Sequence, residues 1–458
     1  MAFDDFRSFV DCLRAAGEVV EINRPIALDD VGKVMKRAQA QSGPSVVFND
    51  NGTNFPLICG VYGDRRKALI AFETSSSELF QKVLHGLDNP IPPRVMDGRP
   101  PCQDIVLQGA DIDLSALPVP QYSPVDGGAY ITPGIVVSKD PETDIPDIGH
   151  YRFLILSKNT FSFSAQPFHR FGKNLAKYKK LGQKARAALV IGVDPILAYT
   201  CQVQVSDTTN DWHVAGGLRG APVELARCVT SDLHVPATSE FVIEFEVDMD
   251  DLVMEGPLGE YTGYYTPPSP KPVATVLAIT HRKSPMFQGL LTGKPITESH
   301  LLKQIPFEAS LFRTLKAQYP TITDISVRAS AGVSFYVVIA MQPRFAGEAR
   351  QVILSAMGTN VRPKWVIIVD PDIDVHSSSD VEWAMAFRVQ PARDAIVIDH
   401  IPAGPSDPSI DDPKIDRPMR TASAIGIDAT RPYGKPFSQV ADVPGWAEFD
   451  VPELKSRG

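Results

Sequence analysis

The sequence predicts a multidomain protein of mixed α+β and α/β class, with a strand-rich centre between two α/β units. Helical and β periodicities alternate early in the chain, short apolar strands separated by turn residues fill the middle, and the alternation then returns. The chain has 458 residues, enough for about three domains with separate cores. The predicted parts are an N-terminal α/β region over 1–102, a central domain over 103–300, an α/β domain over 301–405 and a C-terminal tail over 406–458.

The composition is typical of a soluble globular protein, with 43% hydrophobic and 22% charged residues. A net charge of −9 argues against nucleic acid or an anionic membrane as the main partner, although it is compatible with a local basic site. The five cysteines are dispersed and include no C-x2-C pair, which indicates reduced thiols. No apolar stretch reaches about 18 residues and the first residues do not resemble a signal peptide, so we expect a cytoplasmic protein without a membrane span.

The N-terminal region begins with apolar residues at helical spacing, which predict a helix over 3–17 that ends at Gly17. A β-branched run predicts a strand over 19–22. A second helix is expected over 29–40 and a strand over 45–48, before an Asn-Gly turn. A linker to the next domain is indicated by Pro90, Pro92, Pro93, Pro100 and Pro101.

The central domain is predicted to be a barrel or sandwich because five short β-branched or aromatic runs are punctuated by turn residues. These runs cover 134–138, 153–156, 188–193, 241–247 and 273–279. One helix is expected over 172–187, and its many lysines and arginines are typical of a solvated face.

The C-terminal unit shows renewed alternation, with the size of an independent domain. Its predicted helices cover 301–318 and 347–357, and its predicted strands cover 334–340 and 365–370. Beyond residue 403 proline and aspartate are frequent, which predicts a meandering tail packed over another domain or subunit. The sequence contains no P-loop, G-x-G-x-x-G or G-x-S-x-G motif.

Two glutamates, Glu255 and Glu260, flank a Gly-Pro-Leu-Gly segment. The glycines and Pro257 oppose a helix, so we expect a tight turn that directs both carboxylates into one cleft. A pair of carboxylates at close range is suited to proton transfer. The alternative interpretation is a solvent-exposed acidic turn.

Three further side chains have the chemistry of metal ligands: Asp147, His169 and Asp211. Such a set fits a divalent ion such as Mn2+ or Mg2+, because oxygen ligands dominate and no thiolate is near. The three lie on separate segments, so a second interpretation stays open, in which each is a turn aspartate or a structural histidine.

Several other charged residues are candidates for ion pairs or for contacts with a ligand. Arg152 directly precedes an apolar strand, where an unpaired guanidinium is costly to bury, so we expect it to meet a carboxylate of the protein or of a substrate. Lys364 precedes another apolar strand and is either a solvated strand end or a phosphate ligand. Arg388 and Asp394 form either a surface pair or an ion site, and the sequence favours the surface pair.

Short blocks along nearly the whole chain together resemble the UbiD-like decarboxylases, a family that uses prenylated FMN. Their order and compatible spacing make the resemblance specific, unlike any single block. The blocks lie at 130–134, 149–152, 191–195, 215–220, 235–240, 255–260 and 369–374, with Lys364 before the last and Trp383, Arg388 and Asp394 after it.

The resemblance implies roles for individual residues. The family's catalytic Glu-Arg-Glu network is matched by Arg152, Glu255 and Glu260. The implied cofactor-binding residues are Thr132, His150, Tyr151, Phe168 and Lys364, the lysine at the cofactor phosphate. The implied metal set comprises Asp147, His169, Asp211 and Glu255, with Arg388 and Asp394 near a monovalent-cation site. Asp147 and Asp211 depart from the family's usual Asn and Glu, and Phe168 stands where many relatives have a polar residue.

The family also implies a fold and an activity. We expect a central split β-barrel that binds prenylated FMN, Mn2+ (or Mg2+) and K+, and a C-terminal oligomerisation domain that forms a homodimer or homohexamer. The implied reaction is reversible, non-oxidative decarboxylation of an aromatic or heteroaromatic acid through a covalent cofactor adduct. Glu260 would donate the proton, Arg152 and Glu255 would position the substrate, and a separate flavin prenyltransferase would supply the cofactor.

Other interpretations are an acyclic α,β-unsaturated acid as the substrate, and a non-catalytic flavin-binding or assembly scaffold of the same fold. The two departures among the metal ligands motivate the scaffold, whereas the intact Glu-Arg-Glu set argues against it. A metal-dependent hydrolase is disfavoured because the sequence lacks an H-E-x-x-H motif.

Overall fold

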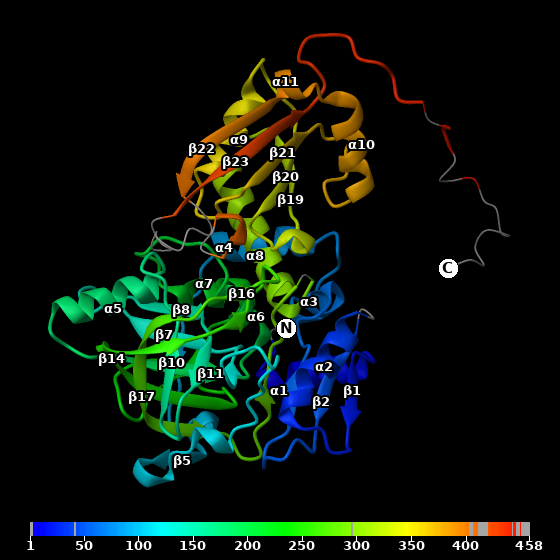
Figure 1. The fold of residues 1–458 in the computed structure, drawn as a ribbon. Helices are drawn as coiled ribbons and strands as arrows, with labels where there is room; N and C mark the ends of the chain where they lie inside the picture. Colours follow the sequence, from blue (N-terminus) through cyan, green and yellow to red (C-terminus); the bar gives the residue numbers. More distant parts are fainter. Residues whose placement is uncertain are drawn as a thin grey trace.

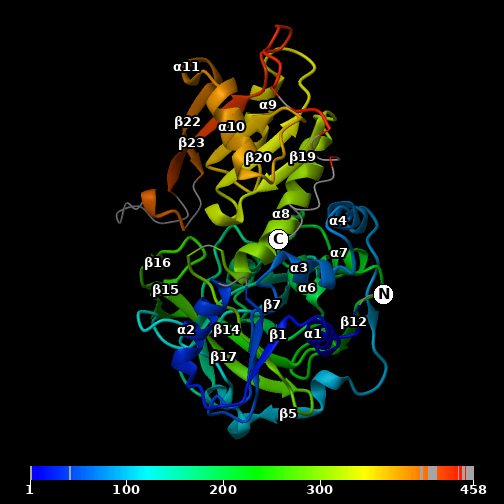
Figure 2. The ribbon, with the colours of Figure 1, turned by 90° about the vertical axis from the view of Figure 1, so that its right-hand side faces the viewer.

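The computed structural model describes residues 3–40, 43–294, 296–402, 406–410, 420–441, 443–445 and 449. The N-terminal region lies beside the central sheet, and the C-terminal domain lies above both in the views of Figures 1 and 2. Helix α8 (Glu298–Lys316) joins these parts and contacts helices of the first two. None of the described helices is both long and apolar enough to cross a membrane.

The N-terminal region is a small α/β unit, as predicted. A capping box between Asp5 and Ser8 starts its first helix, which buries Phe6 and Phe9 on one face. Its four-stranded sheet has the order β1-β2-β3-β18, so a strand from the end of the central domain completes it. The elements are α1 (Phe6–Ala15), β1 (Val19–Ile22), α2 (Leu28–Gln39), β2 (Ser45–Phe48), β3 (Leu57–Cys59), α3 (Arg65–Ala71), α4 (Leu79–Asp88) and β18 (Phe287–Gln288).

The central domain is built on one curled sheet of nine strands, with the order β6-β9-β10-β17-β14-β11-β7-β8 and β5 beside β17. This open half-barrel confirms the barrel-like prediction. The strands are β5 (Ile105–Gln108), β6 (Tyr130–Ile131), β7 (Ile135–Lys139), β8 (Pro146–His150), β9 (Phe153–Ile155), β10 (Thr160–Phe163), β11 (Ala185–Ile191), β14 (Phe241–Glu255) and β17 (Ser269–His281). Smaller pieces are β4 (Arg94–Val95), β12 (Glu224–Arg227), β13 (His234–Pro236), β15 (Leu258–Gly259), β16 (Tyr265–Thr266), α6 (Pro195–Thr200) and α7 (Asp211–Arg219).

The basic helix of the central domain is shorter than predicted. Helix α5 (Arg170–Lys180) ends before Gly182, which adopts a left-handed backbone with φ +67°, and β11 begins at Ala185. The prediction of helix up to residue 187 was therefore wrong. The strand Ala185–Ile191 pairs with both β7 and β14. This pairing on both edges favours the strand conformation over a continuation of the helix.

The C-terminal domain has a five-stranded sheet in the order β19-β20-β21-β23-β22. Its elements after α8 are β19 (Ile322–Val327), β20 (Tyr336–Met341), α9 (Glu348–Met357), β21 (Trp365–Val369), α10 (Ser378–Arg388), α11 (Pro391–Asp394), β22 (Ala395–Pro402) and β23 (Thr421–Ala429). The predicted tail differs here, because β23 lies inside the sheet between β21 and β22. Residues 411–419, 442, 446–448 and 450–458 of the predicted tail lie outside the described residues.

The core of the central domain explains the apolar run of β11. Ala188 and Val190 point into one buried cluster, whereas Leu189 and Ile191 point into another on the opposite face. A strand buried on both faces reads as continuously apolar rather than alternating.

Replacement of Leu189 by alanine should reduce the free energy of unfolding by about 2–5 kcal/mol, because it opens a cavity in a close-packed core. The matched control is Leu181→Ala at a half-exposed position, which should change stability little. Urea unfolding followed by circular dichroism compares the two, and equal effects would contradict this assignment of the core.

Helix α8 buries a carboxyl group at Glu308, whose oxygen accepts a hydrogen bond from the Val327 amide at 3.0 Å. Burial raises the pKa of Glu308 to about 7. The folded state therefore binds this proton more tightly than the unfolded chain. Its stabilising contribution is complete below the unfolded pKa, near 4.5, and is lost as the pH rises through about 7.

Glu308→Gln should consequently reduce the loss of stability between pH 5 and pH 8, by at most about 3 kcal/mol. Urea unfolding at both pH values measures the difference. Glu382→Gln, at an exposed position on α10, should leave the pH dependence as it is in the native protein. An unchanged pH dependence in Glu308→Gln would disprove the buried-proton explanation.

Candidate active site

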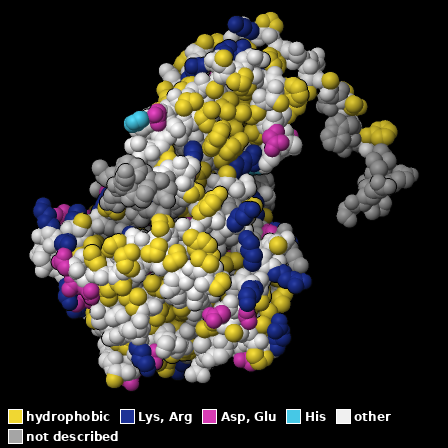
Figure 3. Space-filling model, in the orientation of Figure 1, with side chains coloured by type: hydrophobic (Ala, Val, Ile, Leu, Met, Phe, Trp, Pro, Cys, Tyr) yellow, Lys and Arg dark blue, Asp and Glu magenta, His cyan; other side chains and the backbone are white. Residues whose placement is uncertain are grey.

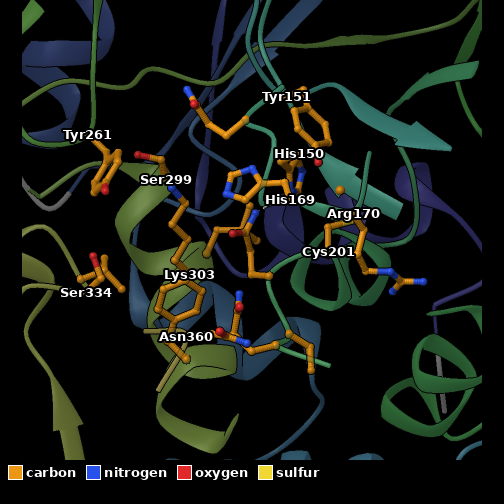
Figure 4. A pocket seen from close by; sticks show the side chains of 18 of the residues that line it. His150, Tyr151, His169, Arg170, Cys201, Tyr261, Ser299, Lys303, Ser334 and Asn360 are labelled. Carbon is orange, nitrogen blue, oxygen red and sulfur yellow. Dashed lines mark hydrogen bonds between the residues drawn. The ribbon is translucent and has the colours of Figure 1, made fainter. Parts of the chain in front are cut away.

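A cavity of about 480 Å³ lies where the central sheet meets α8 and the C-terminal domain. Its wall is formed by the end of β8, the segment before α5, the end of α6 and the turn after β15, together with α8 and the segment after α9. Figure 4 shows side chains from these elements converging on the cavity. The volume lies in the range typical of sites for small molecules and cofactors.

The structure brings Arg152, Glu255 and Glu260 together at one wall of this cavity. The Arg152 Nε lies 3.1 Å from Glu255 Oε1, and its Nη2 lies 3.3 Å from Glu255 Oε2. The Nη1 of the same guanidinium donates to Glu260 Oε1. One cation therefore holds both glutamates, but of the two carboxylates that were predicted to reach one cleft only that of Glu260 lines the cavity.

Each member of this set is placed by the sheet. Glu255 ends β14, whose pairing with β17 continues to this residue. Arg152 lies between β8 and β9, and Glu260 begins the loop that joins β15 to β16. Tyr130 on β6 donates a hydrogen bond to Glu255 at 3.0 Å, and the Thr266 hydroxyl donates to Glu260 at 3.1 Å.

The three residues differ in access to the cavity. Arg152 and Glu260 line it, whereas Glu255 lies behind them and its side chain is 1% exposed. Burial by itself lowers the pKa of Arg152, but the charges of Glu260 and Glu255 outweigh it and hold this pKa above its ordinary value. Arg152 thus remains a cation, and Glu260 is the acidic group of the set that faces a ligand.

The residues predicted to hold a divalent metal are arranged differently. Arg170 lies between the two aspartates, with Nη1 2.7 Å from Asp211 Oδ1 and Nε 3.4 Å from Asp147 Oδ1. Within the described parts of the chain, no group of three or more His, Cys, Asp or Glu side chains is arranged to hold a metal ion. Both carboxylates of the predicted metal centre are therefore paired with Arg170 in this structure rather than grouped with His169.

The electrostatics of this corner reflect burial. Burial and the neighbouring Asp211 raise the pKa of Asp147 to about 7, against the opposing effect of Arg170. His169 and Arg170 both line the cavity (Figure 4), and the guanidinium of Arg170 lies between the two aspartates. Burial, together with the charges of Lys303 and Arg362, lowers the pKa of His169 to about 4, so its imidazole is neutral at physiological pH.

The remaining predicted metal ligands also have other partners. Glu255 is occupied by Arg152 and Tyr130. Arg388 pairs with Asp370 at 2.7 Å, and a guanidinium provides no lone pair for a cation. Asp394 pairs with Arg393 and accepts from the Gln390 amide. The predicted K+ site at Arg388 and Asp394 is thus two separate sets of ion pairs.

Four of the five predicted cofactor ligands line the cavity: Thr132, His150, Tyr151 and Phe168. Thr132 donates to the Leu290 carbonyl at 2.6 Å, and His150 Nδ1 lies 2.8 Å from the Gln202 amide nitrogen. Lys364 does not line the cavity. It pairs with Asp407 at 2.9 Å in the C-terminal domain, so its ammonium already has a carboxylate partner in the protein.

The sequence reasoning missed a polar face of α8. Ser299, Lys303 and Phe307 recur every fourth residue and all line the cavity. The ammonium of Lys303 lies 4.2 Å from the centre of the Tyr261 ring, and burial lowers its pKa. The serine and the lysine at i, i+4, which lie on one face of the helix, were the signal that this face lines a site.

Arg362 was also missed, because it lies in a loop. It adopts a left-handed backbone with φ +53° and its guanidinium lies 4.7 Å from the centre of the Phe168 ring. Neither Lys303 nor Arg362 forms an ion pair in the described chain, whereas Arg152, Arg170 and Lys173 all do. The cavity therefore combines free positive charge for an anionic ligand with an acid, Glu260, at another wall.

Family models match the chain in three consecutive parts, which together cover most of it. The N-terminal domain of 3-octaprenyl-4-hydroxybenzoate carboxy-lyase (UbiD) matches residues 10–87. The Rift-related central domain of the same family matches residues 94–295, and its C-terminal domain matches residues 300–429.

Individual relatives agree over the same extent. An uncharacterized protein of Archaeoglobus fulgidus is 29% identical, covering 94% of this chain and 93% of the relative. The UbiD-class enzyme HmfF of Pelotomaculum thermopropionicum, solved with FMN, is 27% identical over 97% of this chain and 99% of its own, with a TM-score of 0.88. Vanillic acid decarboxylase of Sedimentibacter hydroxybenzoicus in its closed form is 26% identical over 98% of both chains, with a TM-score of 0.89.

Replacement of Arg152 should show how much its charge contributes to the stability of the fold around the two glutamates. Arg152→Met leaves Glu255 buried without its counter-charge, and should lower the free energy of unfolding by about 3–5 kcal/mol. The double variant Arg152→Met/Glu255→Gln should recover part of this loss. Urea unfolding of Arg152→Met, Glu255→Gln and the double variant gives a double-mutant cycle for this pair. Strictly additive changes in the free energy of unfolding would contradict a direct coupling.

Proposed function

Since the chain belongs to the UbiD family of carboxy-lyases, we propose that it decarboxylates an aromatic or heteroaromatic carboxylic acid with prenylated FMN as its cofactor. The observation that carries this proposal is the Arg152–Glu260 pair at the wall of a cavity that also contains two cations, Lys303 and Arg362, with no ion-pair partner among the described residues. A scaffold without catalysis would have no need for a buried charge set open to a cavity.

The residues present fit a flavin nucleotide. Lys303 and Arg362 offer positive charge for its phosphate, while Tyr151, Phe168 and Tyr261 supply aromatic surface. Prenylated FMN, when bound, supplies an electron sink for the pair of electrons released when CO2 leaves the substrate. No step of the proposal depends on Mn2+ or K+, because the carboxylates among their predicted ligands are engaged in ion pairs.

Arg152 and Glu260 provide the polar chemistry. Arg152 is held as a cation beside the cavity, so it attracts the carboxylate of the substrate and orients the bond to CO2. Once that bond breaks, the carbon requires a proton, and Glu260 is the acid of the set that lines the cavity. Glu255 and Tyr130 position the guanidinium from behind.

The relatives support the choice of substrate class. Vanillic acid decarboxylase carries its aromatic substrate in its name, and HmfF has been solved with FMN and, in an evolved dimeric form, with prenylated FMN. Because decarboxylation and carboxylation share one transition state, the same site serves both directions at high CO2. A separate flavin prenyltransferase supplies the cofactor in this proposal.

Oligomerisation through the C-terminal domain completes the proposal, as a homodimer or homohexamer. Hydrophobic side chains gather on the surface of this domain (Figure 3). Its exposed apolar residues include Trp383 and Phe387, and the latter is 70% exposed. Exposed aromatic groups of this size are typical of contact surfaces between subunits.

Co-expression with a flavin prenyltransferase should yield a protein whose absorbance and mass spectra reveal bound prenylated FMN. This preparation should then release CO2 from at least one member of a panel of aromatic and heteroaromatic acids. Release only from acyclic α,β-unsaturated acids would overturn the substrate class. A folded protein that binds no flavin would instead favour the scaffold.

Glu260→Gln should retain the flavin and lose turnover by about a hundredfold or more, because the amide cannot donate the proton that the carbon requires. Flavin content by absorbance and CO2 release by mass spectrometry separate the two effects. Glu382→Gln on the surface of α10 is the control and should keep both. Normal turnover in Glu260→Gln would remove Glu260 from this role.

A further inference from the structure

In the corner formed by Asp147, Asp211 and Arg170, a cationic side chain lies between two buried carboxylates. Both aspartates are about 5% exposed, so bulk water solvates neither carboxylate well. The guanidinium between them makes two further hydrogen bonds, to the carbonyls of Pro146 at 3.0 Å and Thr209 at 2.9 Å. Both terminal nitrogens of the guanidinium thus donate hydrogen bonds and Nε lies 3.4 Å from Asp147 Oδ1, which together fix Arg170 in this place.

The carboxylate oxygens of Asp147 and Asp211 also have hydrogen-bond donors. Asp211 Oδ1 accepts from Arg170, and its Oδ2 accepts from the Ile148 amide at 2.9 Å. Asp147 Oδ2 accepts from the Ser138 hydroxyl at 3.3 Å. A divalent cation would have to displace these donors and lie beside a buried guanidinium, and the repulsion between the two charges is strong where water is excluded.

His169, the third predicted metal ligand, does not point toward the two aspartates. His169 immediately precedes Arg170, yet its ring faces the cavity while the guanidinium turns to the aspartates (Figure 4). The described chain accordingly contains no His/Asp/Glu cluster with the geometry of a metal site. The donor set does not fit a divalent metal, and the reason is a side chain of the protein itself.

Lys303 and Arg362 supply positive charge for an anionic ligand in the cavity. Lys303 on α8 and Arg362 after α9 line the cavity, and in the part of the chain that the structure describes neither has a carboxylate partner. Arg362 lies over the ring of Phe168, the neighbour of His169, so it reaches the cavity from the C-terminal domain. Lys303 reaches it from the face of α8 that carries Ser299.

We propose that Arg170 permanently fills the place of a divalent cation, and that the cavity binds the phosphoester end of its flavin through Lys303 and Arg362 without a metal. This inference rests on the proposed function, since it concerns the same cavity and cofactor. It assigns Lys303 and Arg362 as binding residues and Arg170 as a positioning residue that keeps Asp147 and Asp211 from recruiting a metal.

The first test is metal and flavin analysis of the full-length protein, co-expressed with a flavin prenyltransferase and then dialysed against EDTA. Flavin content from the absorbance spectrum should be retained, while mass spectrometry of the elements should find no stoichiometric Mn2+, Mg2+ or other divalent metal. About one divalent ion per chain, or loss of the flavin that added Mn2+ reverses, would overturn the inference and leave the proposed function standing. Absence of flavin with and without Mn2+ would overturn both.

The second test measures binding of FMN and of riboflavin to the purified protein by flavin fluorescence, in EDTA. Lys303→Met should raise the Kd for FMN about tenfold or more and leave the Kd for riboflavin, which lacks the phosphate, nearly unchanged. Lys303→Arg should restore most of the FMN affinity. Lys180→Met, on the exposed end of α5, is the matched control and should change neither Kd. Equal weakening of FMN and riboflavin would show that Lys303 does not contact the phosphate.

The third test removes the guanidinium. Arg170→Met leaves two buried carboxylates without a counter-charge, so this variant should take up about one Mn2+ per chain and gain thermal stability from it, unlike the native protein. A folded variant that ignores Mn2+ would show that Arg170 does not stand in a cation site. Should the variant fail to fold, the metal analysis of the native protein decides the question.

Discussion

The candidate site depends on one ionic interaction: a single guanidinium, Arg152, that neutralises two glutamates from the same turn. Glu255 is almost fully buried at the end of β14, where an unpaired carboxylate would be very costly. The Arg152 side chain reaches it from the start of β9, so the curl of the sheet brings the two together. Glu260 is then held on the cavity side of the same cation, with access to a ligand.

The same device occurs a second time in the domain. Arg170 also joins two acidic residues, Asp147 and Asp211, and its Nη2 donates to two backbone carbonyls. All three side chains line the cavity, as Arg152 and Glu260 do. The chemical difference is that Asp147 and Asp211 are both paired with a guanidinium that is also held by the backbone, whereas Glu260 accepts from Arg152 and from the Thr266 hydroxyl.

Helix α8 links these sites to the rest of the molecule. It begins against the N-terminal region, lines the cavity through Ser299 and Lys303, and ends in the core of the C-terminal domain. The cavity therefore has walls from two domains, and Arg362 reaches it only through the packing of the C-terminal domain along α8. Motion of that domain would change the distance of Arg362 from the other charges, whereas the Arg152 set lies wholly within the central domain.

The sequence by itself determined most of the architecture. Periodicity and turn residues were sufficient for the α/β units, for the strand-rich centre and for the turn that brings Glu255 and Glu260 together, because these features depend on local spacing. Local spacing failed where long-range pairing decided the outcome. Helix α5 is shorter than predicted because β11 pairs on both edges, and β23 lies within the C-terminal sheet rather than in a tail.

Only the tertiary structure decided which charges meet. Asp147, His169 and Asp211 have the residue types of a metal site, yet the residue after His169 turns its guanidinium into the space between the aspartates. Likewise Lys303 and Arg362, distant in sequence, line one cavity while Lys364 pairs elsewhere. Residue types limit the possible chemistry, but the sign and partner of each charge are fixed by contacts across the fold, since burial makes every unpaired charge costly.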